Sequence, residues 1–199
     1  MQMMSRLPRI PFPPTHSDCD LAALVHDRGD APDDLLRGFF DRRIGEGHAA
    51  LGVLQTGRPR IDGPDRMPAF DLVPGFEGSE TIDTLPNARP DACRALLDRL
   101  ARTLAEALPR EPDVLVLNRF GRAEAEGTGL IGLLAEAVIA EVPVLIAVPR
   151  VLFPNWLGLT RGMTVRIGPS REGLERWWRS IGHGEAPASP SGCFCEAAK

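Results

Sequence analysis

The apolar residues of this chain occur in short uninterrupted runs separated by longer stretches with helical spacing. Uninterrupted runs lie at residues 21–25, 49–54, 114–117 and 143–148. Runs of this length without polar alternation are typical of strands buried on both faces of a parallel sheet. A shorter run at 164–167 predicts one further strand.

Between these runs the apolar side chains recur every three or four residues, as on one face of a helix. Such stripes are formed by Leu35, Leu36, Phe39 and Phe40 after Pro32, by Leu96, Leu97, Leu100, Leu104 and Leu108 after Pro90, and by Leu130, Leu133, Leu134, Ala137 and Val138. A closing helix is expected from Ser170, a favourable N-cap, through Trp178. Strands that alternate with helices predict an α/β fold of three layers, a mostly parallel sheet with helices on both faces.

The pattern breaks into short pieces between residues 57 and 89, where 69–73 and 80–83 predict a small antiparallel hairpin insertion. A proline-bearing loop is expected at 149–154. Both ends of the chain are rich in Pro, Gly, Ala or Ser, so we expect a disordered tail at 1–18, one α/β domain at 19–181 and a flexible tail at 182–199.

The composition argues against several classes of protein. The 199 residues are 43% hydrophobic and 25% charged with a formal charge of -4, which argues against nucleic-acid binding. No apolar run is long enough to insert into a membrane, and the proline-rich N-terminus does not resemble a signal peptide, so we expect a cytoplasmic protein.

Polar residues concentrate after the predicted strand at 114–117. Strands of a parallel sheet end at one edge, where open α/β sheets bind ligands, and the loops after 21–25 and 143–148 should reach the same edge. The predicted ligand-binding residues are Asp27, Arg28, Asn118, Arg119, Gly121, Arg122, Glu124, Glu126, Gly127 and Arg150.

The chemistry of these residues leaves several alternatives open. The arginines could hold an anion through forked hydrogen bonds, helped by N–H groups of the glycine-bearing loop. Glu124 and Glu126 could instead hold a divalent cation or act as a base toward water. The glutamates could also be solvated residues before a helix, and Arg150 an exposed salt-bridge partner.

The first strand–turn–helix, residues 21–45, lies where a P-loop would lie, but it lacks P-loop chemistry. A working P-loop needs a lysine for the phosphates and a Ser or Thr hydroxyl for magnesium, and residues 26–34 contain neither. Its carboxylates would repel a triphosphate, and Asp33 and Asp34 fit a simple role at a helix start. His26 and His48 show no metal-site spacing, and Cys193 and Cys195 form only an isolated C-x-C pair.

The stretches LAALVHDRGDAPDDLLRGFF, VLVLNRFGRAEAEGTGLIGLLAEAV and VPVLIAVP, with the later Trp-Trp helix, resemble the bacterial family catalogued as domain of unknown function 2478. That family is similar in outline to the nucleoside-triphosphatases with a P-loop fold, and it is usually met beside molybdate-uptake and molybdenum-enzyme genes. The resemblance implies a P-loop-like fold with a degenerate Walker A motif. It also implies a role near molybdenum metabolism, with a molybdenum enzyme or a transporter as partner. Asn118 stands where the hydrolases carry a magnesium-binding acid.

Three functions remain in competition. The first is an accessory protein that binds an oxyanion or a nucleotide, without hydrolysis. The second is a metal-dependent nucleoside-triphosphatase or phosphoester hydrolase that uses Glu124 or Glu126 as base. The third is a protein-interaction adaptor. The missing P-loop residues favour the first over the second, and the polar loop favours it over the third. Phosphate and molybdate are both tetrahedral, so the sequence does not distinguish them.

Overall fold

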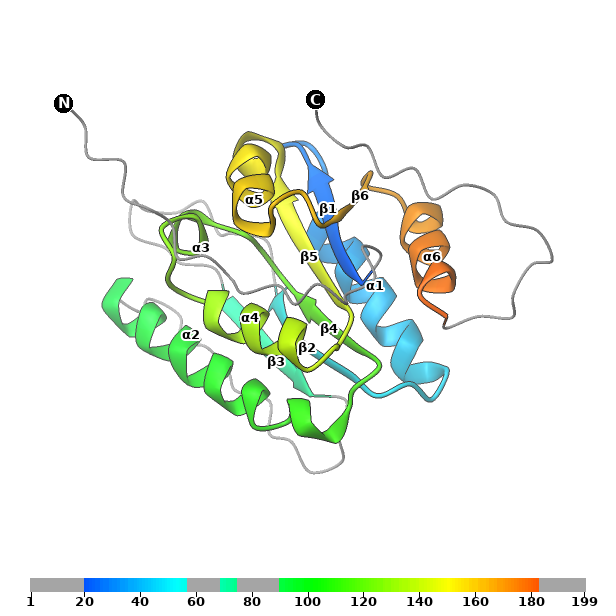
Figure 1. Cartoon of the computed structure of the whole chain (residues 1–199), viewed down its shortest axis with the longest axis horizontal. Coiled ribbons are helices and arrows are strands. Elements are labelled where there is room, and N and C mark those ends of the chain that lie inside the picture. The colour runs from blue at the N-terminus through cyan, green and yellow to red at the C-terminus, as the bar shows by residue number, and fades with distance from the viewer. Residues whose placement is uncertain (1–19, 57–68, 75–89, 183–199) are drawn as a thin grey trace.

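One mixed sheet of six strands forms the centre of the computed structural model, which describes residues 20–56, 69–74 and 90–182 (Figure 1). The strand order is β3-β2-β4-β5-β1-β6, and only β3, at one edge, runs antiparallel to its neighbour. The four predicted central runs are therefore neighbouring parallel strands, as expected. The strands are β1 Leu21–His26, β2 Ala50–Thr56, β3 Ala69–Pro74, β4 Val114–Leu117, β5 Val144–Pro149 and β6 Val165–Ile167.

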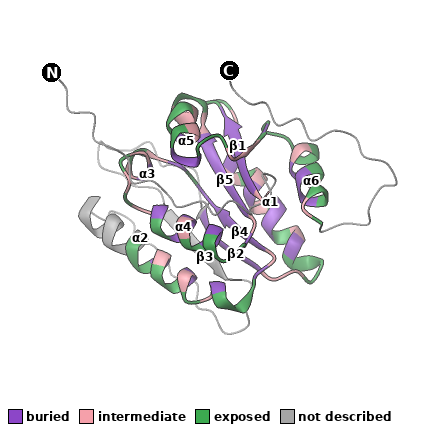
Figure 2. Cartoon of the chain, viewed as in Figure 1, coloured by how far each residue is buried: buried purple, intermediate pink, exposed green. Residues whose placement is uncertain are grey.

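Helices cover both faces of this sheet, which confirms the predicted three-layer architecture. On one face, α1 (Pro32–Gly45) and α6 (Arg171–Ser180) pack against alternate residues of the strands such as Leu24 and Val116. On the other face, side chains of α2 (Pro90–Ala105), α4 (Ile131–Ile139) and α5 (Phe153–Thr160) form a second apolar cluster. The described side chains of β1, β2, β4 and β5 are almost all buried between these layers (Figure 2), which explains the uninterrupted apolar sequence of these strands.

Local sequence sets the ends of the helices. Ser170 caps α6, because its Oγ accepts a hydrogen bond from the backbone N–H of Gly173 at 3.1 Å. In α1, Pro32 occupies the first turn, where a missing N–H costs nothing. The acids Asp33 and Asp34 follow in the same turn and complement the positive end of the helix dipole.

Two predicted loops contain short helices instead. The polar segment after β4 holds α3 (Arg122–Ala125), and the proline-bearing segment after β5 holds η2 (Arg150–Leu152) followed by α5; a further short helix, η1 (Leu108–Arg110), follows α2. Pro154 is the second residue of α5, a position that tolerates proline, so it starts a helix there rather than preventing one.

The predicted hairpin is described only in part. Its first segment, β3, is antiparallel to β2, with Leu51 opposite Pro74 and Thr56 opposite Ala69. Its second segment, 80–83, and the two predicted tails lie outside the described residues, apart from Gly182.

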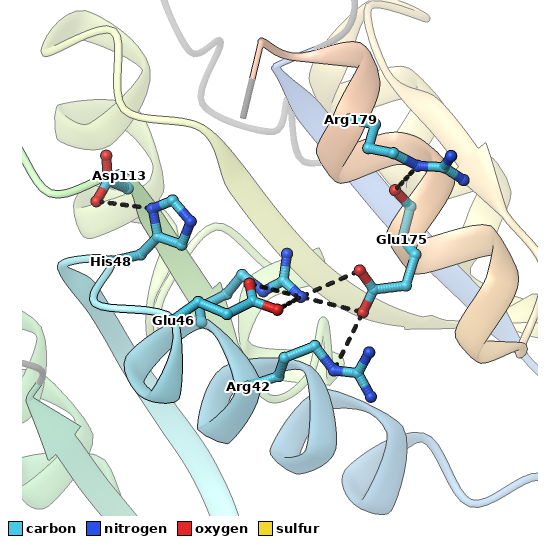
Figure 3. A network of polar contacts seen from close by, with 7 residues as sticks. Arg42, Glu46, His48, Asp113, Glu175 and Arg179 are labelled. Carbon is cyan, nitrogen blue, oxygen red and sulfur yellow. Dashed lines mark hydrogen bonds and ion pairs between the residues drawn. The ribbon is translucent and has the colours of Figure 1, made fainter. Parts of the chain in front are cut away.

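A buried arginine joins α1 to α6. The side chain of Arg43 is 2% exposed, and its Nη2 lies 3.0 Å from Oε2 of Glu175 on α6 and 3.2 Å from Oε2 of Glu46. Figure 3 shows these two glutamates, with Arg42 also directed at Glu175. Its guanidinium carbon also lies 5.0 Å from the ring centre of Phe39 and 5.1 Å from that of Trp178. The charge is thus paired and covered by aromatic faces, as a buried guanidinium requires.

Candidate functional site

The parallel strands β1, β4 and β5 all end at one edge of the sheet, which we term the carboxyl edge. From there the chain leaves β1 toward α1 on one face, and it leaves β4 and β5 toward α4 and α5 on the other face (Figure 1). Because β1 and β5 are neighbours, their following segments leave the sheet side by side and then diverge toward opposite faces. Ligands of open α/β sheets bind at such a switch point.

An ion pair joins the segments that follow β1 and β5. Arg150, the first residue after β5, directs its Nε to both carboxylate oxygens of Asp27, the first residue after β1, at 2.9 Å each. The two side chains are 50% and 59% exposed, so solvent screens the pair and an incoming anion can compete for the guanidinium.

The loop in the P-loop position is closed by its own carboxylate. The backbone N–H of Asp27 donates to Oδ2 of Asp30 at 2.6 Å, and the N–H of Asp30 donates back to the carbonyl oxygen of Asp27 at 3.2 Å. Arg28 lies exposed in this turn. A backbone donor that a P-loop would offer to phosphate is therefore already used within the loop.

Asp33, in the first turn of α1, faces the loop after β4. Its Oδ2 lies 3.5 Å from Nη2 of Arg119, and its Oδ1 is buried and accepts no hydrogen bond from the described residues. Burial raises the pKa of Asp33 above its ordinary value, while the neighbouring charges of Arg119 and His26 act to lower it and that of Asp34 to raise it. The carboxyl group is thus held where its charge is poorly solvated.

His26, the last residue of β1, lies beside this carboxyl group. Its side chain is buried, and Nδ1 lies 3.2 Å from the carbonyl oxygen of Asp27. A carbonyl oxygen can only accept, so Nδ1 is the donor of this contact. Nε2 is buried and has no hydrogen-bond partner among the described residues. Asn118, after β4, is also buried, and it continues the alternation that places Val114 and Val116 on the α1 side of the sheet.

Glu124 organises the loop after β4 from within. Its Oε2 accepts the backbone N–H of Gly121 at 2.9 Å, and its Oε1 accepts that of Leu130 at 3.2 Å. A Cβ on Gly129, which has φ +66°, would collide with Oε1 of Glu124. Gly127 also adopts a positive φ of 84°. This carboxylate and these glycines shape the turn between α3 and α4.

The remaining predicted residues lie further out. The side chain of Arg122 is 91% exposed, and its Nε is 4.0 Å from Oε1 of Glu126, which is 67% exposed. The structure therefore brings Asp27 and Arg150 into contact and places Arg119 against Asp33, whereas Arg122 and Glu126 face solvent.

Sequence reasoning assigned Asp33 only to helix capping and gave His26 no role. The signal that could have found them is positional. His26 follows Leu24 by two residues and so shares its face of the sheet with α1, and Asp33 lies in the first turn of that helix.

Within the described ranges, no three His, Cys, Asp or Glu side chains gather into a metal-binding cluster. None of the described helices combines the length and the apolar character needed to cross a membrane.

The family described as "Protein of unknown function (DUF2478)" matches residues 21–177. The chain belongs to this family. Its matched region runs from the start of β1 into α6 and so includes every strand and the whole carboxyl edge.

One curated relative adds context. The chain is 32% identical over 163 residues to "Molybdenum import ATP-binding protein ModC 2" of Bradyrhizobium diazoefficiens, a match that covers 80% of this chain but 18% of that protein. The chain thus spans less than a fifth of its relative's length. With the α/β architecture, this similarity supports a P-loop-like fold. No solved structure matches the chain.

Proposed function

We propose that this protein is an accessory protein that binds an oxyanion or a nucleotide at the carboxyl edge of a degenerate P-loop-like fold, without hydrolysing it. The observation that carries this proposal is the position of Arg119 and Arg150. Each follows a different strand, and both face the P-loop position, where each is paired with an aspartate. Guanidinium groups whose partners are partly exposed carboxylates can exchange them for an anionic ligand.

The absence of hydrolysis is proposed on chemical grounds. Phosphoryl transfer needs positive charge on the leaving and transferring oxygens, supplied in P-loop enzymes by a lysine and by magnesium. Residues 26–34 offer carboxylates instead, and Asp30 already accepts the N–H of Asp27. Glu124, one candidate base for the alternative hydrolase, has each of its carboxylate oxygens engaged by a backbone N–H group.

The link to molybdenum is proposed from the relative's printed name alone. That name describes a protein more than five times as long as the matched segment, so its ATP binding can reside outside the segment. We therefore propose that the chain serves molybdenum or molybdate metabolism in the cytoplasm, with a transporter or a molybdenum enzyme as partner, rather than acting as the transport ATPase itself.

Thermal-shift measurements on the purified chain test the proposal, with phosphate, molybdate, tungstate and ATP as probes. A ligand at about 100 times its Kd adds about 2.7 kcal/mol to the free energy of unfolding, which for a chain of this size raises Tm by roughly 5–10 °C. We expect such a rise with at least one probe.

Arg150→Ala should weaken binding of that probe by roughly 1.5–3 kcal/mol, the range for a hydrogen bond to a charged group. Arg176→Ala removes an equally exposed arginine from α6, away from the carboxyl edge, and should leave the affinity unchanged. Equal affinities for both variants, or no rise with any probe, would contradict the proposal.

A further inference from the structure

Two buried polar atoms lie beneath the first turn of α1 without hydrogen-bond partners among the described residues: Nε2 of His26 and Oδ1 of Asp33. The His26 side chain is only 7% exposed. Buried polar groups in native proteins nearly always have a partner, which can be water or a ligand. Two such atoms in one place therefore indicate a small polar site.

Both atoms lie on the α1 side of the sheet. Alternate residues of β1, Ala22 and Leu24, contact the apolar cluster that includes α1, and His26 continues this alternation. The charge of His26 also acts on the carboxyl group of Asp33. Arg119 borders the same carboxyl group from the β4 side, and the Asp27–Arg150 pair lies between the ends of β1 and β5.

The site combines hydrogen-bond donors with one acceptor, the carboxylate of Asp33. Arg119 and the N–H groups of the first turn of α1, which have no acceptor inside the helix, favour negatively charged oxygens. An ionised Asp33 can only accept, so its Oδ1 is satisfied by an O–H group and repels a bare oxyanion. A ligand that pairs with both the donors and this acceptor carries charged oxygens and a hydroxyl.

We propose that the ligand of this polar site is a tetrahedral oxyanion that keeps a hydroxyl group, such as hydrogen phosphate. Its hydroxyl donates to Oδ1 of Asp33, and its charged oxygens face Arg119 and the N-terminus of α1. His26 contributes its unpaired Nε2 to the site. This inference rests on the proposed function and narrows it, because it names the class of anion that the carboxyl edge accepts.

Asp33 would then act as the selective residue. Phosphate and arsenate retain a proton at neutral pH, whereas sulfate and molybdate, the anions of stronger acids, retain none. A site built to pair with a ligand hydroxyl rejects an analogue that lacks it, because the buried acceptor is left unpaired against a like charge. Molybdate is therefore excluded from this site, and a link to molybdenum would pass through a partner protein.

Isothermal titration calorimetry at neutral pH tests the inference with four inorganic probes: phosphate, arsenate, sulfate and molybdate. Sulfate is the matched control, since it has nearly the size and charge of hydrogen phosphate but no proton. The native chain should bind phosphate and arsenate at least tenfold more tightly than sulfate and molybdate. Equal binding of sulfate and phosphate would overturn the inference and leave the proposed function standing. No binding of any of the four would overturn the inference and the oxyanion form of the proposed function, and the thermal shift with ATP then decides its nucleotide form.

Two variants separate the preference for phosphate over sulfate from the affinity for all four probes. Asp33→Asn replaces the acceptor-only carboxylate by an amide that can donate, so the preference for phosphate over sulfate should fall at least tenfold. His26→Gln should weaken binding of all four probes while leaving that preference unchanged. A preference that survives Asp33→Asn in a variant with a native circular dichroism spectrum would contradict the role of Asp33.

Discussion

Asp33 experiences two opposing influences at the start of α1. Its place in the first helical turn favours a negative charge, because the N-terminal end of a helix carries a partial positive charge. Its burial disfavours that charge, and the burial is the larger influence, since the pKa of Asp33 is raised. A residue that destabilises the fold in this way is typical of a site kept for function.

The pH dependence of the free energy of unfolding should reveal the destabilisation caused by the buried Asp33 carboxylate. A carboxyl group with a raised pKa holds its proton longer in the folded state, so the free energy of unfolding falls as pH rises from the ordinary pKa of 3.8 through the folded pKa. Asp33→Asn should therefore raise Tm at pH 7, by about 2–4 °C for each kcal/mol recovered. The gain should shrink below pH 4. Thermal unfolding of both proteins across pH 3–8 measures it, and a lower Tm for the variant at pH 7 would refute the effect.

Single residues of the site were predictable where sequence position alone decides their place. Asp27 and Arg150 directly follow neighbouring parallel strands, and the structure joins them. The role of Glu124 was not predictable, because it depends on a turn that returns the N–H of Leu130 to its carboxylate. Contacts made by loop folding leave no periodic signal in the sequence.

Among the elements, the segment between β4 and α4 depends on Gly129. Gly129→Ala should destabilise the protein by roughly 1–3 kcal/mol, because the new Cβ meets the Glu124 carboxylate and the backbone is left-handed there. Gly132→Ala, three residues later in α4, has open space for its Cβ and should be neutral or stabilising. Urea unfolding of the two variants provides the comparison, and equal midpoints would show that the Glu124 contact does not constrain this segment.

The contact between α1 and α6 depends on Arg43 more than on its neighbour. Arg43→Ala should lower the free energy of unfolding by roughly 1.5–3 kcal/mol, since it removes hydrogen bonds between charged groups. Arg42→Ala loses a partly exposed contact of 3.5 Å to the same Glu175 and should cost less than about 1 kcal/mol. Chemical denaturation measures both, and a larger loss for Arg42→Ala would mean that burial of Arg43 contributes little.

The buried strands and the capped helix were predictable from the sequence, whereas the short helices were not. The strand at Val114–Leu117 and the helix after Ser170 were predictable from buried runs and a cap. In contrast, α3 has four residues, too few to show helical spacing, and α5 begins beside a proline that suggested a loop. What holds α5 in place is tertiary: Trp156 is fully buried, and its Nε1 donates to Oγ1 of Thr164 at 3.1 Å.

At the scale of the whole molecule, the proposal requires that ATP is not turned over. Protein purified to homogeneity should release phosphate from ATP with magnesium no faster than a buffer blank, because no lysine lies in the P-loop position to neutralise the transferring group. A coupled phosphate-release assay measures this. Robust turnover that depends on magnesium and disappears in Glu126→Gln would instead establish the hydrolase.

Hydrogen–deuterium exchange with and without inorganic phosphate tests the location of the anion site most directly. Binding at the carboxyl edge should protect three segments that are distant in sequence, residues 27–35, 118–130 and 150–153, because they follow β1, β4 and β5. Exchange elsewhere should change little. Protection confined to the groove between α1 and α6, lined by Gly38, Arg171 and Leu174, or absent from all three segments at saturating phosphate, would contradict an anion site at the carboxyl edge.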